Sequence, residues 1–337
     1  MILKVPQPYL LFLGDATDAR YAKTAFGLRD WAPNHCIGEL ALPTATITTG
    51  LPRLQPAEAY SRGARSVVIG IANYGGVLAP TWIPVLLECL EAGLDVVSGM
   101  HSRLAQNTQI RQTAERLNRQ LIDVRTPPPG IPVASGARRS GKRLLTVGTD
   151  CALGKKYTAL ALHRAFKRRG LDADFRATGQ TGILISGAGM PLDAVVADFV
   201  AGAAEMLSPA APDSHWDVVE GQGSLFHPSY SGVSLGLLHG TQPDVIVLCH
   251  EVGRDRILGL DDYSIPPLGE AIDLNLRLAR RTNPRVRCAG ISLNTSRLSE
   301  AQAEVVMAEH RTSLKMPVAD PIRGGVEFER LVDACLS

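Results

Sequence analysis

The segment that most constrains the fold runs from residue 144 to residue 166 and reads LLTVGTDCALGKKYTALALHRAF. An apolar run is followed by a glycine-containing turn and then by an amphipathic stretch, which predicts a buried strand, a loop and a helix. In such a loop the backbone N–H groups converge on an anion, and the N-terminal end of the helix adds positive charge. The sequence therefore predicts a phosphate-binding turn, with a purely structural glycine turn as the alternative.

This turn departs from the usual G-x-x-x-x-G-K-[ST] pattern at two points. The interval from Gly148 to Gly154 is one residue longer, and Lys155 is followed by Lys156 where a Ser or Thr would hold magnesium. The pattern therefore predicts phosphate binding and leaves ATP hydrolysis open. We expect the phosphates of a cofactor to be bound by Gly148, Thr149, Asp150, Cys151, Gly154, Lys155 and Lys156.

The length of the chain indicates two domains, because 337 residues exceed what one hydrophobic core usually organises. Residues 125–142, RTPPPGIPVASGARRSGK, sustain neither the strand period nor the helix period and mark the boundary. We therefore assign residues 1–130 to a first domain and residues 131–337 to a second.

Both domains show apolar runs that alternate with amphipathic segments, which predicts parallel sheets covered by helices. In the first domain we expect strands at 9–15, 66–70, 94–99 and 120–124, and helices at 81–94 and 103–120. In the second we expect strands at 143–148, 216–221, 243–250, 286–294 and 316–320, and helices at 155–169, 268–282 and 299–314. The sequence thus predicts an α/β fold with its ligand site at the carboxyl ends of the strands.

Composition narrows the classes of function. The chain has 32 glycines and only 5% aromatic residues, which suits an α/β enzyme that acts on a small molecule. A net charge of +2 implies no nucleic-acid partner. No apolar stretch approaches the roughly 20 residues of a membrane span, and residues 1–23 show no cleavage site, so we expect a cytoplasmic protein. The six cysteines form no C-x-x-C pair, so we expect buried thiols and no metal site.

Three motifs in the right order resemble those of dethiobiotin synthetase and its relatives among the P-loop proteins. They are GTDCALGKKYT in the loop, VVEGQGSLFHP at 218–228 and GISLN at 290–294, which resembles the strand leading to the nucleotide base. The resemblance implies a P-loop NTPase-like parallel sheet in the second domain. Magnesium would have to rely on groups such as Thr158, Asp150 or Glu220.

A closer resemblance covers nearly the whole chain. The loop motif, together with the segments 14–31, 176–205 and 220–244, is similar to a bacterial and archaeal family that includes D-glutamate N-acetyltransferases. That resemblance implies a Rossmann-like open parallel sheet followed by the P-loop-like domain, and transfer of an acetyl group from acetyl-CoA to the amine of D-glutamate. Coenzyme A carries a pyrophosphate and a ribose phosphate, which need a cradle but no hydrolysis. We also expect a homo-oligomer.

An acetyl transfer needs a base for the amine and contacts that hold the acceptor. Glu220 stands at the end of a buried strand, where burial can raise the pKa of a carboxylate enough to accept a proton; alternatively it orients the loop or a metal. His227 follows in a loop as a second catalytic candidate, or as a structural hydrogen-bond partner.

Polar groups and arginines could bind the acceptor, since a bidentate arginine suits each carboxylate of D-glutamate. The candidates are Thr178, Gln180, Thr181, Arg254 and Arg256. Asp198 and Glu205 share a helix face and could bind an ammonium group or a metal, or simply pack. In the first domain GIANYGG, 70–76, makes no dinucleotide fingerprint, and Lys23 and Asn73 are weak candidates.

Two other functions stay open. One is an ATP- and magnesium-dependent ligase or kinase resembling dethiobiotin synthetase, which would form ADP. The other is a nucleotide-sensing or metallochaperone-like regulator without turnover, although the chain has no histidine-rich or cysteine-rich tract.

Overall fold

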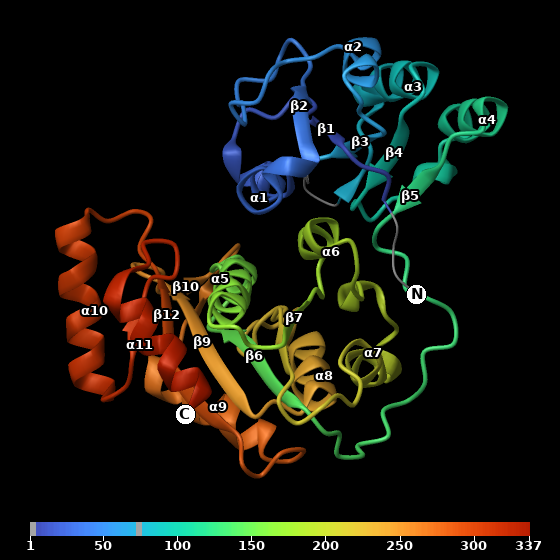
Figure 1. Ribbon diagram of the computed structural model, residues 1–337. Helices are drawn as coiled ribbons and strands as arrows, with labels where there is room; N and C mark the ends of the chain where they lie inside the picture. The colour runs from blue at the N-terminus through green and yellow to red at the C-terminus, as the bar shows by residue number, and fades with distance from the viewer. Residues whose placement is uncertain (1–4, 72–75) are drawn as a thin grey trace. The chain divides into compact units, whose positions relative to one another are not determined.

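The computed structural model describes residues 5–71 and 76–337 (Figure 1). The chain divides into two compact units: Met1–Pro127 with Gln180–Pro191, and Pro128–Gly179 with Leu192–Ser337. The linker expected at 125–142 contains the first crossing between the units. The return of residues 180–191 to the first unit was not expected from the sequence.

Within the described part of the first unit, five strands form one parallel sheet in the order β2-β1-β3-β4-β5. The strands are β1 (Tyr9–Phe12), β2 (Cys36–Leu40), β3 (Ser66–Ile69), β4 (Asp95–Ser98) and β5 (Leu121–Asp123). Every residue of β1, β3 and β4 is buried, which is why these strands appear in the sequence as continuous apolar runs. The predicted parallel sheet is confirmed, with β2 as a strand that the sequence analysis missed.

Helices pack on this sheet. They are α1 (Lys23–Trp31), α2 (Pro56–Ser61), α3 (Ile83–Glu91) and α4 (Thr108–Leu117). The helix predicted at 81–94 is present as α3, which buries Ile83, Leu86 and Leu90 and leaves Leu87 half-buried.

A short helix of the returning segment, α6 (Gln180–Ser186), packs against α1. The hydroxyls of Thr181 and Thr24 are hydrogen-bonded at 3.0 Å between the two helices. A Cβ atom at Gly99 would lie 1.5 Å from Oε1 of Gln180, so only glycine allows this close approach. Specific contacts therefore hold the segment on the first unit.

The second unit, which the structure describes in full, contains a six-stranded parallel sheet in the order β13-β12-β9-β6-β8-β7. Its strands are β6 (Lys142–Gly148), β7 (Ala173–Arg176), β8 (Trp216–Val219), β9 (Val245–Glu251), β12 (Arg287–Asn294) and β13 (Val318–Ala319). A separate antiparallel hairpin pairs β10 (Arg256–Ile257) with β11 (Leu260–Ser264). The predicted α/β fold with two parallel sheets is confirmed.

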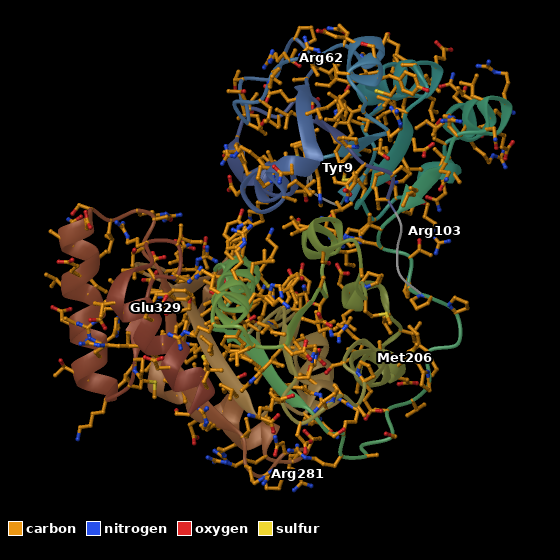
Figure 2. The ribbon with its side chains drawn as sticks, viewed as in Figure 1. Tyr9, Arg62, Arg103, Met206, Arg281 and Glu329 are labelled. Carbon is orange, nitrogen blue, oxygen red and sulfur yellow. The ribbon has the colours of Figure 1, made fainter. Side chains whose placement is uncertain are left out.

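Helices cover both faces of this sheet. They are α5 (Lys155–Arg168), α7 (Val200–Leu207), α8 (Ser231–Thr241), α9 (Leu268–Ala279), α10 (Glu300–Leu314) and α11 (Gly325–Leu336). Helices α5 and α11 contact each other, and so do α8 and α9 (Figure 1). Glu329 of α11, labelled in Figure 2, pairs with Arg169 at the end of α5 at 2.6 Å.

The ends of two helices follow local rules. Ser299 caps α10 by accepting a hydrogen bond from Gln302 N. Helix α5 ends before Gly170, whose φ of 76° lies in the left-handed region. Among the helices in residues 5–71 and 76–337, none has the length and apolarity of a membrane span.

Candidate functional site

A loop of residues 149–154 joins β6, which ends at Gly148, to α5, which begins at Lys155. Because the sequence predicts that it binds phosphate, we call it the phosphate loop. Gly154 has a φ of +115° and Ala152 a φ of +55°, so the loop turns through left-handed backbone just before the helix. A Cβ at Gly148 would lie 3.1 Å from Nζ of Lys155. The lysine side chain therefore folds back over the loop, and its Nζ donates a hydrogen bond to the Asp150 carbonyl oxygen at 2.7 Å.

Lys155 is buried, with 6% of the residue exposed. Burial lowers the pKa of its ammonium group, while Cys151, Cys249, Asp150 and Glu220 act in the opposite direction. A buried cation needs a partner to offset its lost hydration. A phosphate oxygen at the loop would be a stronger partner than the neutral carbonyl of Asp150.

The Asp150 carboxylate braces the loop. Its Oδ1 accepts a hydrogen bond from Cys151 N at 2.6 Å, and its Oδ2 accepts one from Leu258 N at 2.8 Å. Arg254 Nη1 donates to the same Oδ2 at 3.1 Å and to Cys151 O at 2.8 Å. Arg254 also pairs with Glu251 at the end of β9. These contacts place Arg254 against the phosphate loop, where its guanidinium holds the loop backbone.

The three groups named as possible magnesium ligands are all engaged in hydrogen bonds. Thr158 Oγ1 donates to Gly154 O at 3.2 Å and is bonded to the Ser292 hydroxyl at 2.7 Å. The Asp150 carboxylate accepts the hydrogen bonds from Cys151, Leu258 and Arg254. Glu220 Oε2 accepts two backbone hydrogen bonds. Oxygens of all three side chains therefore already make hydrogen bonds within the protein.

Glu220 directly follows β8 and is 4% exposed. Its Oε2 accepts hydrogen bonds from the backbone N–H groups of Thr178 at 2.9 Å and Gly179 at 3.1 Å. Burial raises the pKa of this carboxyl above its ordinary value, although Lys156, the two N–H groups and Lys155 oppose the change. The raised pKa makes this carboxylate a better proton acceptor than an exposed glutamate.

Gly221 brings Glu220 close to the phosphate loop. Its backbone N–H donates to Thr146 Oγ1 of β6 at 2.9 Å. A Cβ at position 221 would lie 1.7 Å from the Thr146 carbonyl oxygen and 3.0 Å from Cδ of Lys155. Only glycine allows β8 to end this close to β6. The carboxylate that follows it and the buried lysine therefore share one edge of the sheet.

His227 also lies at the phosphate loop. A ring nitrogen of His227, the Cys151 sulfur and a carboxylate oxygen of Asp150 lie within 4.8 Å of one another. Nδ1 accepts a hydrogen bond from Ser229 N at 3.1 Å, so the neutral ring carries its proton on Nε2. The sequence did not indicate that this imidazole would lie beside Cys151.

Two predicted loop residues remain. Lys156 lies in the first turn of α5, with its Nζ 4.8 Å from the centre of the Tyr157 ring. Thr149 bonds to Nδ1 of His250 at 2.9 Å. Burial lowers the pKa of His250 to about 4, with His310 and Arg254 acting in the same direction. The imidazole is therefore neutral at physiological pH and serves as a partner of the loop.

The candidates for acceptor binding belong to both units of the chain. Thr178 lies beside Glu220 in the second unit, where its Oγ1 donates to Glu220 O at 2.7 Å and accepts from Gln222 at 2.9 Å. Gln180 and Thr181 belong to α6 in the first unit. Arg256 lies in the hairpin and donates to Ser264 Oγ at 2.9 Å.

Three other candidates lie elsewhere in the fold. Glu205 accepts hydrogen bonds from Ser135 N at 2.8 Å and Gly136 N at 2.9 Å, which holds the linker against α7. Asp198 lies in a short 3₁₀ turn before that helix, and Lys23 is the first residue of α1. Asn73 lies outside the described residues, as does most of the GIANYGG segment.

A second group of metal-ligating side chains, Asp174, His215 and Asp217, lies at the start of β7 and β8, at the opposite ends of the strands. His215 is hydrogen-bonded to Asp172 at 2.8 Å and to Asp217 at 3.2 Å. Arg176 pairs with Asp217 at 2.6 Å. These side chains are partnered within an ion-pair network.

Two family profiles match the chain. The "Domain of unknown function (DUF1611_C) P-loop domain" matches residues 132–332, and the "Domain of unknown function (DUF1611_N) Rossmann-like domain" matches residues 37–127. The chain belongs to the DUF1611 family. The Rossmann-like and P-loop domains expected from the sequence are thereby confirmed.

Curated relatives extend over nearly the full length. A D-glutamate N-acetyltransferase from Tritonibacter scottomollicae is 49% identical over 330 residues, which cover 98% of each chain. One from Pseudoalteromonas sp is 47% identical over 325 residues, which cover 96% of this chain and 98% of the relative. The crystal structure of a DUF1611 family protein from Anabaena variabilis superposes with a TM-score of 0.87 at 34% identity, covering 98% of this chain and 99% of that one. The predicted membership of an enzyme family is correct.

Proposed function

We propose that this chain transfers the acetyl group of acetyl-CoA to the amine of D-glutamate, with the phosphate loop holding phosphates of coenzyme A. Both curated relatives bear the name of that activity. The proposal rests on one arrangement of side chains. The possible magnesium ligands of the phosphate loop are hydrogen-bonded within the protein. Beside the loop lies a buried carboxylate, Glu220, whose pKa is raised. This arrangement suits a phosphate-bearing donor that is bound but not hydrolysed.

In this proposal Lys155 leaves the Asp150 carbonyl and binds a phosphate oxygen, together with N–H groups at the start of α5. Cys151 N is already bonded to the Asp150 carboxylate, so the neighbouring N–H groups supply the cradle. His227 lies beside Cys151, and its Nε2–H group can donate a hydrogen bond to the same phosphates. Asp150 and Arg254 keep the loop in shape.

Glu220 acts as the base. The amine nitrogen of D-glutamate attacks the thioester carbonyl carbon, a C–N bond forms, and the C–S bond to coenzyme A breaks. Glu220 takes the proton that the amine loses and can return it to the departing thiolate. Its two backbone hydrogen bonds fix the carboxylate at the end of β8, where burial keeps its pKa raised.

The test is a thiol-release assay with acetyl-CoA and a panel of D- and L-amino acids, with and without magnesium and ATP. Free coenzyme A that appears with D-glutamate and needs no ATP would support the proposal. ADP formed from ATP in the presence of an acid or amine, without thiol release, would favour the ligase or kinase interpretation instead.

Lys155→Met tests the role of the loop in the same assay. We expect KM for acetyl-CoA to rise roughly 10- to 100-fold, because a hydrogen bond to a charged group contributes about 1.5 to 3 kcal/mol. Lys142→Met is the matched control, since this exposed lysine lies at the opposite end of β6. An unchanged KM in the Lys155 variant would remove the loop from cofactor binding.

A further inference from the structure

The segment that leaves the second unit for the first begins directly beside Glu220. The chain leaves the second unit after Gly179 and re-enters it at Leu192, and the residues between them belong to the first unit. The Leu192 backbone N–H donates a hydrogen bond to the Thr178 carbonyl oxygen at 3.1 Å. The segment 180–191 therefore starts and ends at one hydrogen-bonded point of the second unit.

The two residues before this segment also hold the Glu220 carboxylate. Its Oε2 accepts the N–H groups of Thr178 at 2.9 Å and of Gly179 at 3.1 Å. A Cβ atom at position 179 would lie 2.7 Å from Nε2 of Gln222 and 3.5 Å from Oε1 of Glu220, so the backbone passes close to both side chains. A displacement of Gly179 would therefore lengthen a hydrogen bond to the carboxylate.

The first unit anchors the chain on the other side of Gly179. Helix α6 begins at the next residue, Gln180, and buries Thr181, whose hydroxyl is bonded to that of Thr24 in α1 at 3.0 Å. Both threonines are buried, with exposed fractions of 8% and 3%. One residue separates Gly179 from Thr181, which leaves about two Cα spacings of chain to absorb a shift of the helix. A shift of α6 is therefore passed to the backbone that holds Glu220.

We propose that the hydrogen bond between Thr24 and Thr181 positions Glu220, by holding α6 and, through it, the N–H groups that the carboxylate accepts. This inference rests on the proposed function, because it takes Glu220 to be the base. Thr24 and Thr181 are positioning residues: they act on the carboxylate only through the backbone at 178–179. A side-chain contact within the first unit thereby orients the base of the second.

Loss of this bond has a defined direction of effect on the base. Burial raises the pKa of Glu220, while Lys156, the two N–H groups and Lys155 act to lower it. N–H groups that move away lower the pKa less, so the fall of kcat/KM at acidic pH should begin at a higher pH. KM for acetyl-CoA should stay within about twofold, since the phosphate loop keeps its contacts.

Thr181→Val tests the proposal, because valine is close to threonine in size and lacks the hydroxyl. Amide hydrogen exchange of the peptide that contains residues 178 and 179, followed by mass spectrometry, needs no turnover. Exchange should be roughly 2- to 10-fold faster than in the wild type, the equilibrium factor of one hydrogen bond, and kcat for thiol release with D-glutamate should fall. Thr181→Ser should restore both, since serine keeps the hydroxyl.

Two further variants control for the substitution itself. Thr24→Val removes the other end of the same bond, and combining it with Thr181→Val should speed exchange no further, because the bond is already lost. Thr312→Val is the matched control in α10, where the hydroxyl donates to the Ala308 carbonyl of its own helix at 2.9 Å. Its exchange at 178–179 and its pH profile should match those of the wild type.

Unchanged exchange at 178–179 in both Thr181→Val and Thr24→Val would overturn the proposal and show that contacts within the second unit alone hold these N–H groups. Equal effects of the serine and valine variants at position 181 would also overturn it, because the hydroxyl would then be irrelevant. Failure of every thioester as donor would instead overturn the proposed function, and the exchange rates would still decide whether the first unit restrains residues 178 and 179.

Discussion

Glu220→Gln is the substitution that best separates catalysis from structure at this site. Glu220 Oε2 accepts both N–H groups, from Thr178 and Gly179, so the amide oxygen of glutamine can accept the same two bonds. The fold should therefore be retained. If the carboxylate is the base, kcat should fall by about 10²- to 10⁴-fold, the usual contribution of general base catalysis.

Glu220→Ala should behave differently, because alanine leaves the buried N–H of Thr178 and the part-buried N–H of Gly179 without an acceptor. Each such donor costs about 1 to 3 kcal/mol, so the free energy of unfolding should fall by on the order of 2 to 6 kcal/mol. Urea denaturation of the two variants measures this difference. The glutamine variant should stay within about 1 kcal/mol of the wild type, since its hydrogen bonds persist.

The pH dependence of the wild type supplies the decisive observation. Burial raises the pKa of Glu220, so the basic form is lost as the pH falls through that raised value, and kcat/KM should fall with it. Glu220→Gln should lack this acidic limb. Full activity with an unchanged pH profile in the glutamine variant would refute the role of base and leave Glu220 as a residue that orients the segment at Thr178.

Two further predictions concern stability. Gly221→Ala should lower the free energy of unfolding by about 1 to 3 kcal/mol or more, because the new Cβ would overlap a backbone oxygen of β6. Gly232→Ala, at an exposed site in α8 with no atom within 4 Å of the new Cβ, should be neutral or stabilising; equal losses in thermal unfolding would contradict the packing argument. Burial would lower the pKa of His215, but hydrogen bonds to Asp172 and Asp217 outweigh it and raise the pKa. The stability that His215 contributes should therefore be full below its unfolded pKa of about 6.5 and be lost as the pH rises through the higher folded value. Urea denaturation across this range should show a loss in the wild type that is absent in His215→Gln; parallel curves would reject the assignment.

The element pattern could be predicted because each signal is local. Strands β6 and β9 are buried on both faces and therefore appear in the sequence as apolar runs. Ser299 and Gly170 mark helix ends through their own backbone and side-chain chemistry. Strand β2 was missed because its sequence, CIGEL, contains a glycine and a glutamate; Glu39 is nevertheless buried and bonded to Thr49 at 2.6 Å.

The surroundings of the candidate site could not be predicted in the same way. Arg254 and Asp150 are 104 positions apart and meet because β6 and β9 are neighbours in the sheet. His227 lies beside Cys151 for a similar reason, since β8 pairs with β6 on the other side. The sequence identified these side chains as candidate site residues. The order of the strands in the sheet decided which of them are in contact.

The sequence by itself determined the strand, glycine turn and helix of residues 144–166, the two α/β domains and the carboxylate at the end of β8. Strand burial, helix amphipathicity and glycine turns depend on residues close together in the chain. Tertiary structure alone decided that residues 180–191 return to the first unit and that Arg254 braces the loop. The sequence predicted that burial could raise the pKa of Glu220, and the fold supplies that burial. Burial, pKa and long-range ion pairs depend on which segments the fold brings together, and no local pattern encodes that pairing.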